Sequence, residues 1–182
     1  KQRLRTAQRG HKLLKDKRDE MMRRLLEQVR RARTLRQETA RMLAAVRAAQ
    51  SEAAAALSPA FLAGALLCPA QTLHLETQVR SAMGVALPAF SLSVQAQPGQ
   101  PYGYAQTDGA LDEALSRLHA ALPKLLALAE AEKTVHCMAR ELEAARRRVN
   151  ALEYVLIPEL QEQIRRISMK LEENERGNLV RL

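Results

Sequence analysis

Residues 1–57 contain no proline and one glycine, and their apolar side chains recur at steps of three and four. Such a repeat aligns apolar residues along one side of an α-helix, as in the seam of a coiled coil. The pattern therefore predicts one continuous helix of roughly 85 Å, at about 1.5 Å per residue. The predicted seam contains Leu4, Ala7, His11, Leu14, Met21, Leu25, Val29, Ala32, Met42, Val46, Ala49 and Ala53.

Three residues interrupt this repeat, and we interpret Arg18, Leu35 and Thr39 as points where it drifts out of register. A helix of this length cannot bury its apolar stripe in a small globule, so it requires a partner helix.

Residues 110–182 supply that partner, with Asp108 as a candidate N-cap. Prolines 123 and 158 predict kinks in this second helix. Two successive steps of four, from Leu156 to Leu160 to Ile164, predict a stutter around Pro158. The predicted stripe contains Leu111, Leu115, Leu118, Leu122, Val135, Met138, Leu142, Ala145, Val149, Leu152, Leu156, Leu160, Ile164, Ile167 and Leu171.

Residues 58–109 differ from both helices because prolines, glycines and alternating apolar residues replace the helical repeat. Alternation over about 72–80 and 90–97 predicts two strands, and Gly84 and Pro88 between them favour a hairpin with a longish loop. The apolar face of this predicted hairpin contains Leu73, Leu75, Val79, Leu92 and Val94.

The fold class predicted from these segments is mostly α: a long antiparallel two-helix coiled coil with a small β-hairpin insert at the turn end. Its parts are the N-terminal helix (1–57), the crossover with the hairpin (58–109) and the C-terminal helix (110–182). Composition agrees, because aromatic residues make up 3% of the chain and tryptophan is absent.

Motifs for catalysis are missing from the sequence: no phosphate loop, dinucleotide fingerprint, zinc spacing or nucleophile elbow occurs. The four histidines are scattered, and Cys68 and Cys137 follow no metal or redox spacing. No stretch approaches the roughly 20 apolar residues that span a bilayer. We expect a protein that is not an enzyme by itself, has no catalytic residues, and needs no cofactor or metal.

Positive charge is concentrated at the N-terminal end. Residues 1–50 contain 16 Lys or Arg against 5 Asp or Glu, whereas the rest of the chain is close to neutral. Such a basic helix suits a coiled-coil adaptor or the phosphates of a nucleic acid. The scarcity of aromatic residues for base stacking argues against the nucleic acid.

Two segments resemble the D subunit of the V-type (V/A-type) rotary ATPases. The first runs from Ala7 to Asp19, and the second runs from Arg147 to Ile157 and ends at Pro158. They occur in the right order at the two ends of a coiled coil and flank a strand-like insert, so together they are specific.

The resemblance implies a central rotor shaft that couples ATP synthesis, or ATP-driven proton or sodium transport, to rotation. Its partners would be the A and B subunits of the catalytic hexamer, the F subunit, and a funnel-shaped subunit on the membrane rotor ring. It would lie on the cytoplasmic side as a peripheral part of the complex, with no nucleic acid and no direct membrane insertion.

Three groups of residues are the candidate sites under this resemblance. Pro158 would set a bend in the shaft, and the apolar hairpin face would contact the F subunit. The rotor–stator interface would contain Arg9, Lys12, Lys15, Arg18, Arg165 and Arg166.

Overall fold

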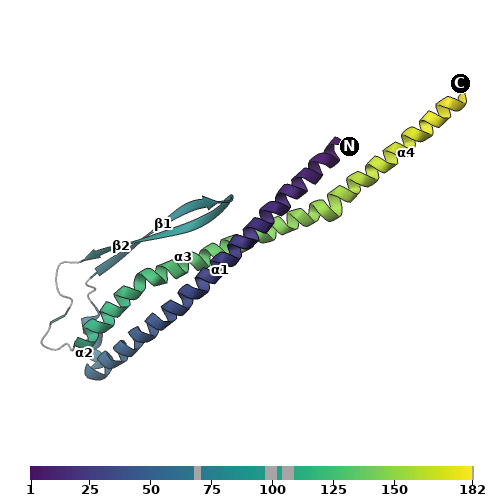
Figure 1. The fold of residues 1–182 in the computed structure, drawn as a ribbon. Coiled ribbons are helices and arrows are strands. Elements are labelled where there is room, and N and C mark those ends of the chain that lie inside the picture. Colours follow the sequence, from purple (N-terminus) through teal and green to yellow (C-terminus); the bar gives the residue numbers. More distant parts are fainter. Residues whose placement is uncertain (68–70, 97–101, 104–108, 182) are drawn as a thin grey trace. The chain divides into compact units, whose positions relative to one another are not determined.

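A computed structural model of the chain describes residues 1–67, 71–96, 102–103 and 109–181, apart from the side chains of Ala96 and Arg181. The predicted N-cap Asp108 and the end of the second strand at residue 97 lie outside these residues. The mostly α fold with a two-stranded insert is confirmed (Figure 1). Its elements are α1 (Gln2–Ala56), α2 (Pro59–Ala65), β1 (Gln71–Ala82), β2 (Val85–Ala96), α3 (Gly109–Ala151), the π-helical segment η1 (Leu152–Leu156) and α4 (Ile157–Arg181).

The chain divides into two compact units, and each unit contains part of both long helical stretches. One unit consists of Lys1–Leu25 and Met138–Leu182, and the other of Leu26–Cys137. In the second unit, Arg36 Nη2 lies 2.6 Å from Glu132 Oε1, and Arg117 Nη1 donates to the carbonyl of Ala45 over 3.4 Å. The residue numbers along α3 fall as those along α1 rise, so the two helices are antiparallel in this unit.

The seam of α1 keeps a strict repeat from Leu4 to Ala53. The interpretation of a drifting register is therefore wrong, because Arg18, Leu35 and Thr39 occupy regular positions of the repeat. Gln28 takes the place expected for Val29, which is exposed. The buried and half-buried seam positions are 4, 7, 11, 14, 18, 21, 25, 28, 32, 35, 39, 42, 46, 49 and 53.

Helix α3 continues through Pro123 without a break. A proline ring removes the donor to the carbonyl of residue 119, and both Pro123 and His119 are exposed, so water can satisfy that carbonyl. Four consecutive residues that follow, 125–128, are all half-buried. Since successive helical residues point about 100° apart, α3 must be covered on more than the side facing α1.

The hairpin provides this second cover. Val85 and Ala89 of β2 are buried, and the backbone N–H of Phe90 donates to Glu130 Oε2 of α3 over 3.1 Å. Figure 1 accordingly shows the two strands running beside α3. A hairpin of two strands is marginally stable alone in water, so packing against a helix stabilises it.

The strands are longer than predicted, and the connection between them is shorter. Residues 71–82 pair antiparallel with 85–96, which leaves only Met83 and Gly84 in the turn. Both have positive φ, 57° and 78°, the signature of a type I′ hairpin turn. Pro88 lies inside β2 and not in a loop. The predicted longish loop is thus absent because a two-residue turn already matches the twist of the strands.

A small apolar cluster closes the end of the second unit. It is centred on Ala53, Ala65 and Leu111, from α1, α2 and α3. Helix α2 begins after Ser58, whose side chain accepts a hydrogen bond from the N–H of Phe61 over 3.3 Å. This N-cap lets the chain turn from α1 into a short helix and bury its apolar side in the cluster.

Candidate interaction surfaces

The N-terminal cations of the predicted rotor–stator set lie on the first unit. Arg9, Lys12 and Lys15 of α1 are exposed and lie off the seam. None of the three forms an ion pair within residues 1–67, 71–96, 102–103 and 109–181. Their charges are therefore available to a partner molecule.

Arg18 differs from these three residues because it occupies a seam position. Its side chain is 28% exposed, and its Nη2 lies 2.7 Å from Asp19 Oδ1. An arginine can bury its aliphatic stem while its charged head reaches water, which explains how it fits the seam. Arg18 thus packs between the helices of its own unit and is a poorer candidate for contact with a partner than Lys12 or Lys15.

Arg165 and Arg166 form a separate group on α4. Both are exposed, and Arg166 Nε lies 3.1 Å from Glu162 Oε1. The His11–Glu153 contact aligns the start of α1 with the region of residue 153, so residue 165 lies about three turns further along, or roughly 18 Å. The structure consequently does not gather the six predicted cations into one cluster.

The segment before Pro158 is a π-helix. The N–H of Ile157 donates to the carbonyl of Leu152, five residues earlier. Pro158 has no N–H to offer Tyr154, and a widened turn accommodates this loss. In Figure 1 the helix changes direction in the yellow-green stretch between the labels α3 and α4, where this segment lies.

The π-turn also moves the seam by one residue. Val149 is fully buried and Leu152 half-buried, but the next seam position is Ile157, followed by Leu160 and Ile164. The predicted stutter through Leu156 is therefore wrong, since Leu156 is 41% exposed. The last predicted stripe residues, Ile167 and Leu171, are exposed as well.

An apolar surface appears where the seam shifts. Tyr154, Val155 and Leu156 are consecutive and exposed, with Tyr154 at 71%. Beside them, His11 Nε2 of α1 lies 3.3 Å from Glu153 Oε2. Sequence reasoning missed this surface because it assumed α-helical spacing through the proline.

The hairpin presents two different faces. Directly opposite residues share a face, so Leu73, Leu75 and Val79 lie on the same side as Val94 and Leu92. This side contains the five predicted contact residues, and it is mostly exposed, with Val79 at 76%. The opposite face includes the buried Val85 and Ala89, which pack toward α3.

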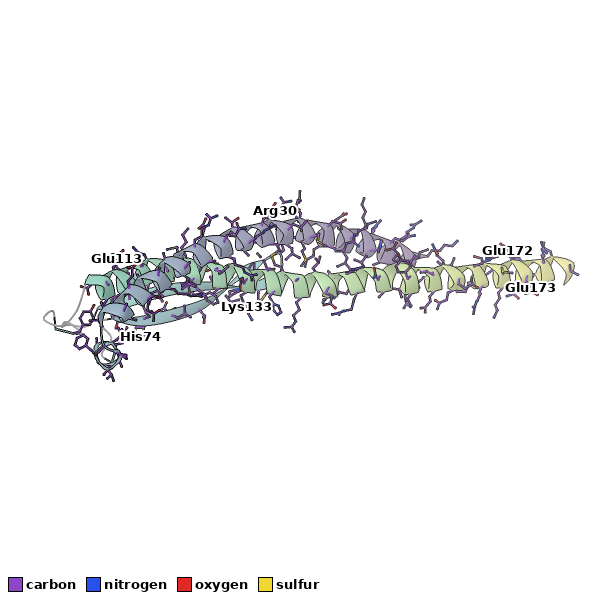
Figure 2. All side chains as sticks on the ribbon, turned by 90° about the horizontal axis from the view of Figure 1, so that it is seen from below. Arg30, His74, Glu113, Lys133, Glu172 and Glu173 are labelled. Atoms are coloured by element: carbon purple, nitrogen blue, oxygen red, sulfur yellow. The ribbon has the colours of Figure 1, made fainter. Side chains whose placement is uncertain are left out.

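Charged side chains cover much of the remaining surface. Figure 2 shows Arg30 of α1 on the side away from α3 in the second unit, and Glu172 and Glu173 on α4 in the first. Among the described residues, no group of three or more His, Cys, Asp or Glu side chains is arranged to hold a metal ion. Within the same residues, no helix combines the length and the apolar character needed to cross a membrane.

The described residues thus form a helical protein in which paired helices carry exposed cations and exposed apolar side chains. Comparison with known proteins gives the family. The whole chain, residues 1–182, matches the family described as the D subunit of ATP synthase. It is 45% identical over 185 residues to the V-type ATP synthase D subunit of Acetivibrio thermocellus, covering all of this chain and 83% of that protein.

Further relatives agree with this match. The V-type ATP synthase D subunit of Clostridium novyi is 46% identical over 186 residues, and that of Clostridium botulinum strain Langeland is 44% identical over the same length. Each alignment covers all of this chain and 86% of the relative. The chain belongs to the family of V-type ATP synthase D subunits, and the resemblance inferred from its two terminal segments is confirmed.

Proposed function

We propose that this chain is the non-catalytic central rotor-stalk subunit of a V/A-type rotary ATPase. It transmits torque between the catalytic A/B hexamer and the membrane rotor ring, for ATP synthesis or for ATP-driven ion transport. The observation that carries the proposal is the uninterrupted seam of α1 in a chain that matches the D-subunit family over its full length. Side chains that interlock at every turn resist twisting of one helix about the other.

The exposed cations suit a surface that moves past several similar partners. Exposed charges interact weakly per pair and over about a Debye length, roughly 8 Å at physiological salt. Arg9, Lys12 and Lys15 therefore offer distributed, exchangeable attraction to the A and B subunits. Arg165 and Arg166 form a second zone of the same kind on α4. The peripheral complex would lie on the cytoplasmic side of the membrane.

Two other features have roles in this proposal. The outward apolar face of the hairpin contacts the F subunit, because Leu73, Leu75 and Val79 are exposed there. The end containing α2 meets the funnel-shaped subunit on the rotor ring. Pro158 and the π-turn before it set a bend that fits the shaft into an asymmetric hexamer.

Reconstitution of the complex tests the charged surface. The triple variant Arg9→Glu, Lys12→Glu and Lys15→Glu should weaken assembly with the hexamer and lower ATP turnover coupled to ion transport. Arg18 is left unchanged because reversal there would disturb the seam. The matched control is Arg41→Glu, Arg47→Glu and Lys133→Glu, which changes the charge equally at three cations of the second unit.

Wild-type chain carrying an affinity tag should recover the A, B and F subunits, identified by mass spectrometry. Failure to recover any rotary subunit would contradict the proposed function. Equal assembly and turnover for the two triple variants across a salt series would remove Arg9, Lys12 and Lys15 from the interface.

A further inference from the structure

The two edges of the hairpin differ. In an antiparallel pair, residues alternate between those that exchange hydrogen bonds with the neighbouring strand and those whose backbone groups point away from it. The two-residue turn after Ala82 makes Ala82 and Val85 a hydrogen-bonded pair, which sets the alternation for the whole hairpin. Outward backbone groups on β1 then belong to Gln71, Leu73, Leu75, Thr77, Val79 and Ser81.

The outward edge of β2 is already protected. The N–H of Phe90 points outward and donates to the carboxylate of Glu130 over 3.1 Å. Pro88 lies at another outward position and has no N–H. Proline and coverage by a helix are two of the ways in which proteins prevent unwanted strand pairing.

The outward edge of β1 has neither protection. Its twelve residues contain no proline and no lysine, and within the described part of the chain its backbone forms no hydrogen bond outside the hairpin. Its outward side chains include Leu75 and Val79 on the exposed apolar face. A long, open edge with an apolar face beside it is the kind of template to which an extended strand adds.

Charges on β1 further restrict what can pair with it. Glu76 and Arg80 lie on the other face, opposite Ser91 and Leu87 of β2. Neither forms an ion pair among residues that the structure describes. Opposite charges placed directly across a strand pair are favourable, so an added strand should carry a basic residue beside Glu76 and an acidic residue beside Arg80.

We propose that β1 is a docking edge at which a neighbouring subunit of the rotary complex adds an extended strand to the hairpin. The added strand has apolar residues at alternate positions, which continue the face formed by Leu75 and Val79, and the two complementary charges. This inference rests on the proposed function, because it requires an assembly that supplies the strand. It deepens that function by giving the binding mode: backbone pairing together with side-chain contact.

Hydrogen exchange read by mass spectrometry tests the binding mode, comparing the free chain with the same chain in the purified rotary complex. Peptides from β1 should gain protection at outward amides, of which the strand has up to six, with exchange slowed at least about tenfold. Peptides from β2 should change less, since its outward edge is covered in the free chain. Equal exchange of β1 in both samples would overturn the docking edge while leaving the proposed function intact.

Proline substitution separates backbone pairing from apolar contact. Val79→Pro keeps an apolar side chain and removes an outward N–H, at the position directly opposite the natural Pro88. It should weaken retention of the strand-donating subunit by about tenfold, the effect of one or two lost hydrogen bonds. Ala86→Pro makes the same change on the outward edge of β2 and should leave retention unchanged. Equal retention of the two variants would contradict the proposal.

The oligomeric state of the free chain separates a partner strand from a second copy. Two β1 strands aligned about Gln78 would also place Glu76 opposite Arg80. Light scattering of the free chain should show a monomer. Hydrogen exchange of the same sample should show rapid exchange at the outward amides of β1. A dimer with concentration-dependent protection of β1 would show self-pairing and overturn the proposal. If no rotary subunit assembles with the wild-type chain, the proposed function and this inference fall together.

Discussion

Helix α1 and the helical stretch from α3 to α4 both carry an apolar repeat, but only α1 keeps it unbroken. Along α1 every position reached by alternating steps of three and four from Leu4 to Ala53 is buried or half-buried. Along the other stretch the spacing changes to five between Leu152 and Ile157. The difference coincides with Pro158, which follows the π-turn directly. A single proline can therefore move a seam by one residue without ending the helix.

Polar side chains, unlike the π-turn before Pro158, leave the spacing of the seam positions unchanged. Arg18, Gln28 and Thr39 all occupy regular seam positions of α1. Their side chains cost stability locally, but each leaves the backbone hydrogen bonds of the helix intact. Pro158 removes a backbone bond and the turn before it widens to a π-turn, whereas Pro123 leaves α3 α-helical.

The largest expected effect tests how firmly the seam of the first unit is packed. Met21 is 1% exposed, whereas its neighbour Met22 is 45% exposed. Met21→Ala should lower the free energy of unfolding by about 2–5 kcal/mol, because it leaves a cavity in the seam. Met22→Ala should change it by less than about 0.5 kcal/mol. Urea denaturation followed by circular dichroism measures both, and similar losses would contradict the assigned seam.

An intermediate effect is expected at the point where the two helical stretches differ. Pro158→Ala restores an N–H for the carbonyl of Tyr154 and should raise the free energy of unfolding by up to about 3 kcal/mol. The π-turn should revert to an α-turn, so that Leu156 becomes buried and Ile157 exposed. A crystal structure of the variant checks the turn, and thermal unfolding checks the stability.

The same variant tests the proposed bend. Coupled rotation should be impaired if curvature helps the shaft fit the hexamer. A more stable variant with normal torque would show that the bend has no functional role. If the π-turn persists without the proline, packing of Ile157 and not the missing donor is its cause.

The smallest change in the free energy of unfolding is expected at Thr39 of α1. Thr39 is 2% exposed, and its Oγ1 has no hydrogen-bond partner in the described structure. Thr39→Val keeps the shape and removes the unsatisfied hydroxyl, so the free energy of unfolding should rise by about 1 kcal/mol. Thr34→Val is the control, since the Thr34 hydroxyl is exposed and donates to the carbonyl of Arg30 over 3.2 Å. A loss of stability in Thr39→Val would indicate that the hydroxyl has a partner in solution.

The fold and the apolar face of the hairpin were predicted from the sequence more completely than the other candidate surfaces. The repeat of α1 and the alternation of Leu73 and Leu75 are local signals, and both elements exist. The turn at Met83 and Gly84 was missed because Pro88 suggested a loop. Pro88 lies at an outward position of β2, where a proline breaks no hydrogen bond of the hairpin. Which positions point outward depends on the strand register, and the alternation alone does not give the register.

The candidate cations show the same limit. Their exposure follows from helical spacing, but their separation into two groups depends on which residues of α1 and α4 lie level with each other. The contact between His11 and Glu153 sets that level. A stripe pattern predicts which side of a helix is buried, and it contains no information on axial alignment with the partner.

The sequence by itself determined the helical ends, the strand-like insert, the basic N-terminal segment and the family, because each depends on local spacing or on matching segments. Tertiary structure decided which face of the hairpin packs on α3, which of its edges is open, and that Ile157 replaces Leu156 in the seam. These outcomes depend on the partner of each side chain. An apolar residue favours burial equally on any face, and only packing selects the face that is covered.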